Sequence, residues 1–214
     1  MPDAKTAGTF LDSVRDLYDN YVMAVGRVVY SWNKLQAVLG DLFLAVTKTE
    51  HAMGQAIWHS ITSDSAQRNI LRASVKASLD PFFATDRCPV REDILWILEI
   101  ADHIASERND AVHVPFDISI VESQLAVVPI SYLGNPKYHK FDQVAVLEGF
   151  AYCEQCADRL RFFVERALSA CQNGRFDAWP GRPEIATRRS RERGRKKPRV
   201  TVKDKQIRSS VSTP

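Results

Sequence analysis

Three residues near the middle of the chain have side chains that could act on a phosphodiester: Arg108, Asn109 and His113. Arginine carries a permanent, fork-shaped charge that matches phosphate, and an imidazole can take up or release a proton near neutral pH. Pro115 disfavours helical geometry in the residue before it, so the helix carrying the three residues should end near His113. Residues four apart share one face of a helix, and Arg108 lies beside that face. We therefore expect the three side chains to reach one anion-sized site at the helix end.

The same three residues also have a purely structural interpretation. Arg108 follows an apolar stripe and could extend from the edge of the core to water. Asn109 could favour the end of the helix, and His113 could interact with its last carbonyl groups. On local spacing alone this interpretation is favoured, because Arg-x4-His is a short pattern that occurs often by chance.

The elements around this helix are predicted to be mostly helical. A helix beginning near Arg91 carries the Arg108 stretch, and shorter helices are predicted over 51–61 and 66–79. Alternating apolar residues over 117–132 predict a β-hairpin between helices. Two long helices, over 10–46 and 142–170, have heptad-like apolar spacing. These apolar positions are Tyr21, Val25, Val28, Trp32, Leu35, Leu39, Leu42 and Val46 in the first, and Val146, Phe150, Cys153, Ala157, Leu160, Val164 and Leu168 in the second. The fold class is therefore a bundle of four or five helices with a small inserted hairpin.

The charge of the chain divides it into two parts. The net charge is +3 over 214 residues, but residues 175–214 carry 13 Lys and Arg against four acidic groups. We expect a helical bundle over 8–174 and a basic, largely disordered tail over 175–214. Within the tail, residues 179–183 are expected to form a last anchor against the body. A polyanion such as nucleic acid is the expected contact of the densest basic run. This run comprises Arg188, Arg189, Arg191, Arg193, Arg195, Lys196, Lys197 and Arg199.

Several function classes find no support in the sequence. No run of about 18 apolar residues could span a bilayer and no secretory signal is apparent, so a soluble, cytoplasmic protein without a membrane partner is expected. Cys153 and Cys156 lie three apart within a predicted helix, where buried packing is favoured over zinc binding. Glu99 and His103 have no second Glu-His pair to complete a metal site. Neither a metal nor another cofactor is predicted.

Two short motifs resemble those of the HEPN superfamily of bacterial α-helical domains. The first is Trp32-Asn33-Lys34-Leu35 in the long first helix, and the second is Arg108-Asn109-Asp110-Ala111-Val112-His113. With the hairpin and the closing helix, the resemblance covers about residues 10–174. Many relatives have Glu where this chain has Gln36, which puts in doubt any salt bridge made by that carboxylate in the family.

The resemblance implies a metal-independent endoribonuclease of toxin or antiphage type. In such an enzyme the Arg and His of two subunits converge, so a homodimer is expected. Arg108 would stabilise the charge on the phosphorane, His113 would transfer protons, and Asn109 would orient the imidazole or a phosphate oxygen. Two alternatives stay open: a catalytically silent module that binds nucleic acid or nucleotide, and a protein-interaction bundle in which Arg108 and His113 only support the interface. An antitoxin-like protein is a further candidate partner.

Overall fold

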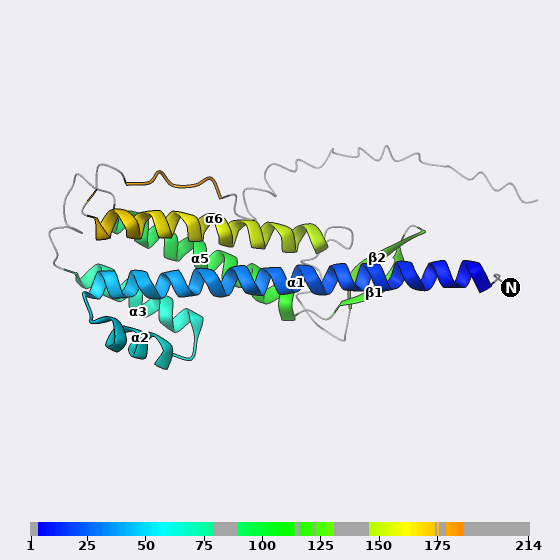
Figure 1. Ribbon diagram of the computed structural model, residues 1–214, viewed down its shortest axis with the longest axis horizontal. Coiled ribbons are helices and arrows are strands. Elements are labelled where there is room, and N and C mark those ends of the chain that lie inside the picture. Colours follow the sequence, from blue (N-terminus) through cyan, green and yellow to red (C-terminus); the bar gives the residue numbers. More distant parts are fainter. Residues whose placement is uncertain are drawn as a thin grey trace, which may run out of the picture.

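The protein forms an elongated helical bundle (Figure 1). The computed structural model describes residues 4–78, 90–113, 116–121, 123–130, 146–173, 175 and 179–185. Within these ranges there are five helices and one two-stranded sheet, which confirms the predicted fold class. The helices are α1 (Ala4–Thr47), α2 (His51–Ser60), α3 (Asp64–Ala77), α5 (Val90–His113) and α6 (Val146–Gln172). The strands are β1 (Phe116–Val121) and β2 (Gln124–Pro129).

Helix α1 is the spine of the bundle and runs unbroken for 44 residues. Its predicted apolar seam is buried from Val28 to Val46, whereas Tyr21 and Val25 nearer the N-terminus are only partly buried. Helix α6 lies along α1 and buries every apolar position predicted for it, including Cys153. Cys156 is buried as well, in agreement with the packing role predicted for the two cysteines. The two long helices therefore bury the stripes that the heptad spacing predicts.

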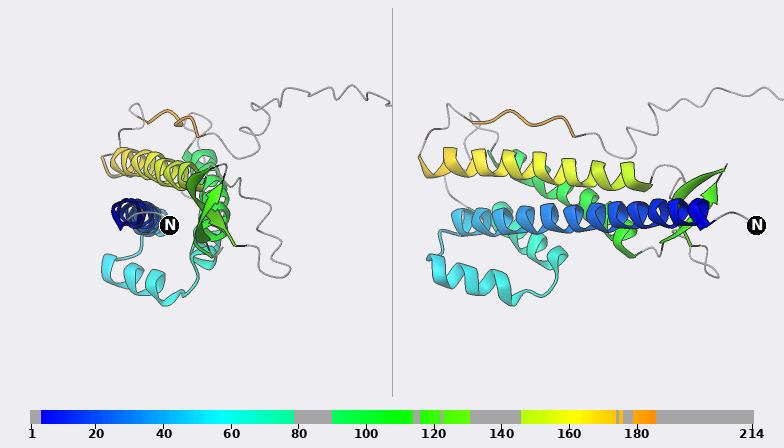
Figure 2. Two further views of the ribbon diagram at one scale, coloured as in Figure 1. Left: turned by 90° about the vertical axis from the view of Figure 1, so that its right-hand side faces the viewer. Right: turned by 45° about the vertical axis from the view of Figure 1, so that its right-hand side comes forward.

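Helices α2 and α3 cover the C-terminal half of α1 (Figures 1 and 2). Glu50 caps α2 by accepting hydrogen bonds from the backbone N–H groups of Ala52 and Met53, and these bonds lower the pKa of its carboxyl. The approach of α2 to α1 is close at Gly40, where a Cβ atom would lie 2.9 Å from Trp58 Nε1. Ser63 caps α3, because its side-chain hydroxyl accepts a hydrogen bond from the backbone N–H of Ala66.

The β-hairpin covers a different side of α1, toward its N-terminus. Strands β1 and β2 pair in antiparallel register, with Ile118 opposite Val127. Ser123 lies in the turn between them with φ 66°. A small second core forms between the hairpin, the start of α6 and residues 17–28 of α1, and burial there raises the pKa of Tyr21. This core comprises Val28, Val127, Val146, Phe150 and Cys153.

A segment beyond α6 returns to the body of the bundle. Trp179 donates a hydrogen bond of 2.6 Å from Nε1 to Asp93 Oδ2 at the start of α5, and Arg182 pairs with the other oxygen of the same carboxylate. Pro180 is buried, and the Arg182 guanidinium lies 5.3 Å from the ring centroid of Trp96. The predicted anchor at 179–183 is confirmed.

Several predictions fall on residues outside the described ranges. They concern the basic run at 188–199, the end of the predicted hairpin region at 131–132, and the first residues of the closing helix at 142–145. Among the helices that are described, none combines the length and the apolar character needed to cross a bilayer.

Candidate functional site

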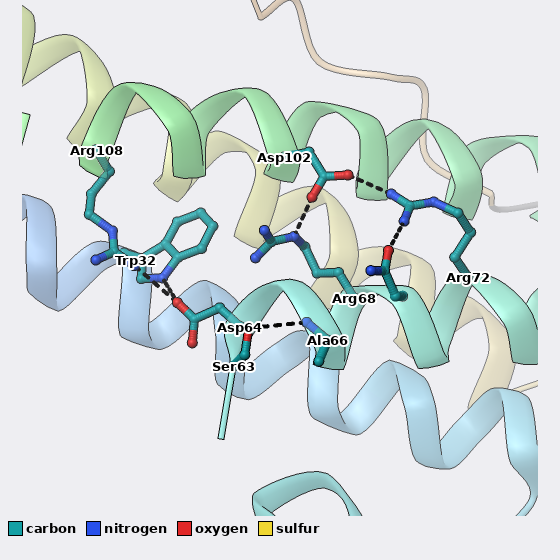
Figure 3. Close-up of polar contacts among 9 residues, drawn as sticks. Trp32, Ser63, Asp64, Ala66, Arg68, Arg72, Asp102 and Arg108 are labelled. Atoms are coloured by element: carbon teal, nitrogen blue, oxygen red, sulfur yellow. Dashed lines mark hydrogen bonds and ion pairs between the residues drawn. The ribbon is translucent and has the colours of Figure 1, made fainter. Parts of the chain in front are cut away.

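Arg108 does not extend freely into solvent but contacts two residues from other helices (Figure 3). Its Nη2 atom lies 3.0 Å from Asp64 Oδ2 at the start of α3. Its guanidinium carbon lies 5.1 Å from the ring centroid of Trp32 on α1. Trp32 in turn donates a hydrogen bond of 2.8 Å from Nε1 to the same oxygen of Asp64. The three residues form a closed set of contacts that fixes the arginine at the junction of α1, α3 and α5.

A second ion-pair group lies beside the first, on the same helices α3 and α5 (Figure 3). Asp102 accepts a hydrogen bond of 2.7 Å from Arg68 Nε and one of 2.6 Å from Arg72 Nη2. The Arg68 guanidinium carbon lies 5.4 Å from the centroid of the Trp32 ring, so two arginines contact one indole. Cation–π contacts of this kind are stronger where water is excluded, and Trp32 is 1% exposed.

These contacts join five charged residues around Trp32, and we call them the arginine cluster: Asp64, Arg68, Arg72, Asp102 and Arg108. Three guanidinium groups meet two carboxylates, so the cluster carries one net positive charge. Arg68 is buried, whereas both carboxylate side chains are 44% exposed. The side chain of Arg108 is 19% exposed. A guanidinium has five N–H donors, and the ion pair to Asp64 engages only part of this capacity. The cluster therefore keeps positive charge and donor capacity close to water.

The other two predicted site residues lie on the surface at the end of α5. Asn109 and His113 are both exposed, and about 40° separates them around the helix axis. Arg108 and His113 are five residues apart, which places them about 140° apart on the same helix. Between the three residues, the described structure contains no hydrogen bond or ion pair. Within one chain, Asn109 and His113 thus lie on a shared face of α5, whereas Arg108 points toward α1 and α3. The convergence of the three side chains on one site stays a prediction.

Gln36 is buried one turn beyond Trp32 on α1. Within the described part of the chain, neither its amide nitrogen nor its amide oxygen has a hydrogen-bond partner. Arg68 Nη1 and Arg108 Nε are also buried without a hydrogen-bond partner among the described residues. Leaving buried polar atoms without partners costs free energy, so these atoms lower the stability of this junction.

The residues of α3 in the arginine cluster were not predicted as site residues from the sequence. None of Asp64, Arg68 and Arg72 belongs to a predicted site. A signal was nevertheless present, because residues 64, 68 and 72 are spaced four apart and form one charged stripe on α3. This stripe lies beside the apolar residues Leu71 and Val75, which are buried in the core. The sequence did not show which helix faces this stripe.

Among the described residues, no three His, Cys, Asp or Glu side chains are grouped so as to hold a metal ion.

No family model, curated protein or solved structure matches the chain. Its function must therefore be inferred from its own residues and contacts.

Proposed function

We propose that the chain is a metal-independent endoribonuclease of toxin or defence type, in which Arg108, Asn109 and His113 act on RNA at the end of α5. The observation that carries the proposal is the position of Arg108. Trp32 and Asp64 fix its guanidinium in place, while His113 stays exposed about one and a half turns further along the same helix. A charge held in advance where negative charge develops is the usual source of electrostatic catalysis.

The reaction uses only groups on the chain and on the RNA. His113 accepts the proton of a ribose 2′-OH, the 2′-oxygen attacks the neighbouring phosphorus, and the bond to the 5′-oxygen breaks. A second imidazole, His113 of a second copy, gives a proton to the leaving 5′-oxygen. Arg108 stabilises the charge on the phosphorane, and Asn109 orients the imidazole or a phosphate oxygen. The products end in a 2′,3′-cyclic phosphate and a 5′-hydroxyl.

A second copy is part of the proposal because of the helix geometry. The angle of about 140° between Arg108 and His113 separates them within one chain. A two-fold arrangement of α5 ends would instead place His113 of one copy near Arg108 of the other. The partners in this proposal are the ones expected from the sequence, RNA and a second copy, and an antitoxin-like protein would act by covering the shared site.

The second candidate function is RNA or nucleotide binding without cleavage. It is favoured by the ion pair between Arg108 and Asp64, because the carboxylate reduces the charge that Arg108 can offer to a phosphorane. The net positive charge of the arginine cluster would still attract a phosphate group.

The decisive experiment is RNA cleavage in EDTA by the purified full chain. His113→Ala and Arg108→Ala should each reduce the rate by on the order of a hundredfold or more. Two matched controls should cleave as wild type does. His103→Ala removes another exposed histidine of α5, and Arg161→Ala removes a similarly buried arginine that is ion-paired to Glu165 on α6.

Mixing wild-type protein with an excess of His113→Ala tests the shared site. If each site uses His113 of both copies, mixed dimers lack one of the two imidazoles, and the cleavage rate per wild-type chain should fall as the variant is added. Wild-type protein that binds RNA but leaves it uncut would favour the binding module. Variants that cut as well as wild type would remove Arg108 and His113 from the chemistry.

A further inference from the structure

The segment that returns to the bundle after α6 is held at both of its ends. We call residues 179–185 the strap. At its first residue, Trp179 Nε1 lies 2.6 Å from Asp93 Oδ2 at the start of α5. Near its last residue, the backbone carbonyl oxygen of Glu184 accepts a hydrogen bond of 3.0 Å from Arg159 Nη1 on α6. Figure 1 shows the strap, in orange, alongside α6.

Side-chain packing also fixes the strap between these two hydrogen bonds. Trp179 and Ile185 pack against the core between the helices, and Pro180 is buried. Arg182 pairs with the carboxylate of Asp93, which is 3% exposed. The basic tail therefore starts from a fixed position on the bundle and not from the free end of α6.

The levels along the bundle follow from two contacts between α5 and α6. The ring centroids of Trp96 and Phe163 are 5.6 Å apart, and Glu107 Oε2 lies 3.9 Å from Cys153 Sγ. Between these contacts α5 advances from residue 96 to residue 107, while α6 returns from 163 to 153. The two helices are thus antiparallel, and the start of α6 lies beside the end of α5.

These levels give the direction in which the strap runs. Arg159 lies one turn from Phe163, on the side toward the end of α5, so it is level with about residue 100 of α5. The strap begins at the level of Asp93 and reaches Arg159 with Glu184. It therefore runs from the start of α5 toward the end of α5, where the candidate site lies.

The basic run at 188–199 begins four residues after Glu184 and is within reach of that site. From the level of residue 100 to His113 the distance along the axis is about 20 Å. His113 lies on the side of α5 away from the strap, and passing around the helix adds up to roughly 15 Å at right angles to the axis. The combined path of about 25 Å needs about eight residues of extended chain. Arg193 and the basic residues after it can therefore reach His113.

Without the strap, the same run would start from the end of α6. Gln172, the last residue of α6, is about 40 Å along the bundle from His113. The tether to Arg193 would lengthen from nine residues to 21. The effective concentration of a tethered group falls with about the −3/2 power of tether length or faster, so the tail would be roughly threefold or more dilute at the α5 end.

We propose that the strap is a positioning element that directs the basic run to the end of α5, so that the tail and the candidate site hold one single strand of RNA. The basic side chains would bind phosphates next to those that meet Arg108 and His113. The inference rests on the RNA binding in the proposed function but not on cleavage, so it would also hold for a module that binds RNA without cutting it.

The test measures binding of a single-stranded 2′-O-methyl RNA, which lacks the attacking hydroxyl and stays intact. Asp93→Asn, with release of the strap verified by proteolysis near Arg182, should weaken binding by the full chain about threefold or more. In a chain that ends after Ala186, the same substitution should leave binding within about twofold, because the strap acts through the tail. Glu92→Gln is the matched control and should change binding in neither chain.

A second variant leaves the strap and the bundle intact. Insertion of about 20 Gly and Ser residues after Ala186 lengthens the flexible tether and should weaken binding about fivefold. The same insertion after Pro214 is its control and should have no effect.

Three results would overturn the inference: no effect of the insertion after Ala186, an equal loss from Asp93→Asn with and without the tail, or tighter binding once the tail is removed. A protein that binds the probe but leaves ordinary RNA uncut would reject the ribonuclease alone. A protein that does not bind the probe would reject both proposals.

Discussion

Arg108 and Asp64 are 44 residues apart in the sequence and form an ion pair of 3.0 Å between the end of α5 and the start of α3. The same oxygen of Asp64 accepts the indole N–H of Trp32, so one carboxylate contacts both Arg108 and Trp32. Arg108, which the sequence predicts to be catalytic, therefore also has a structural role. Experiments on this protein need to separate the predicted catalytic role from the structural one.

The first prediction concerns Asp64→Asn, which keeps an acceptor for Trp32 but removes the negative charge. The free energy of unfolding should fall by only about 1 kcal/mol, because the carboxylate is partly exposed and the pair is screened by water. Affinity for RNA should rise, because the charge of Arg108 is no longer offset. Chemical denaturation and RNA titration of the same sample measure the two effects. Unchanged or weaker RNA binding in a folded variant would mean that Arg108 does not meet phosphate.

The second prediction concerns Trp32→Phe, which removes the N–H donor and part of a fully buried ring. We expect a loss of about 2 kcal/mol in stability, from the missing hydrogen bond and the small cavity that remains. Cleavage of RNA should also slow, since Arg108 loses part of the surface that orients it. Leu39→Ala is a useful control, because it destabilises the core of α1 away from the arginine cluster. At equal residual stability, a slower rate only in Trp32→Phe would identify a positioning role.

The third prediction concerns Asp93→Asn at the start of α5. Asp93 is buried and accepts from both Trp179 and Arg182, so loss of its charge should release residues 179–185 from the bundle. The free energy of unfolding should fall by about 1–3 kcal/mol, the range for a hydrogen-bonded charge that loses its partner. Limited proteolysis should cut the variant near Arg182 faster than wild type. Glu92 is an exposed neighbour in the same helical turn, so Glu92→Gln should leave both the free energy of unfolding and the rate of proteolysis unchanged.

The fourth prediction concerns the basic tail. Eleven Lys and Arg residues follow Thr187, and a chain that ends after Ala186 lacks them while it keeps the segment that packs on the bundle. RNA binding should weaken for all sequences alike, because such side chains act on phosphates. The dependence of affinity on salt should flatten by about 0.7 in logarithmic slope for each phosphate of single-stranded RNA that the shortened chain no longer neutralises. The same affinity and slope in both chains would leave the tail without a role in binding.

Much of the fold could be predicted from the sequence because its signals are local. The apolar spacing over Tyr21–Val46 and Val146–Leu168 identifies two long helices, and Pro115 locates the end of α5. Period-two alternation identifies the hairpin, and Trp179 with its neighbouring prolines identifies the anchor. In each case the residues that identify the element lie within a few positions of one another in the sequence, so the pattern can be read without knowing the tertiary structure.

The surroundings of Arg108 were decided by tertiary structure. The sequence placed an arginine, an amide and an imidazole at one helix end, and the structure keeps Asn109 and His113 exposed there. It turns Arg108 toward Trp32 and Asp64, which lie 76 and 44 residues away in the sequence. Helical periodicity determines which side chains share a face of one helix, but not which face meets another helix. That choice depends on how α1, α3 and α5 pack together, and it alone decided which charges surround the arginine.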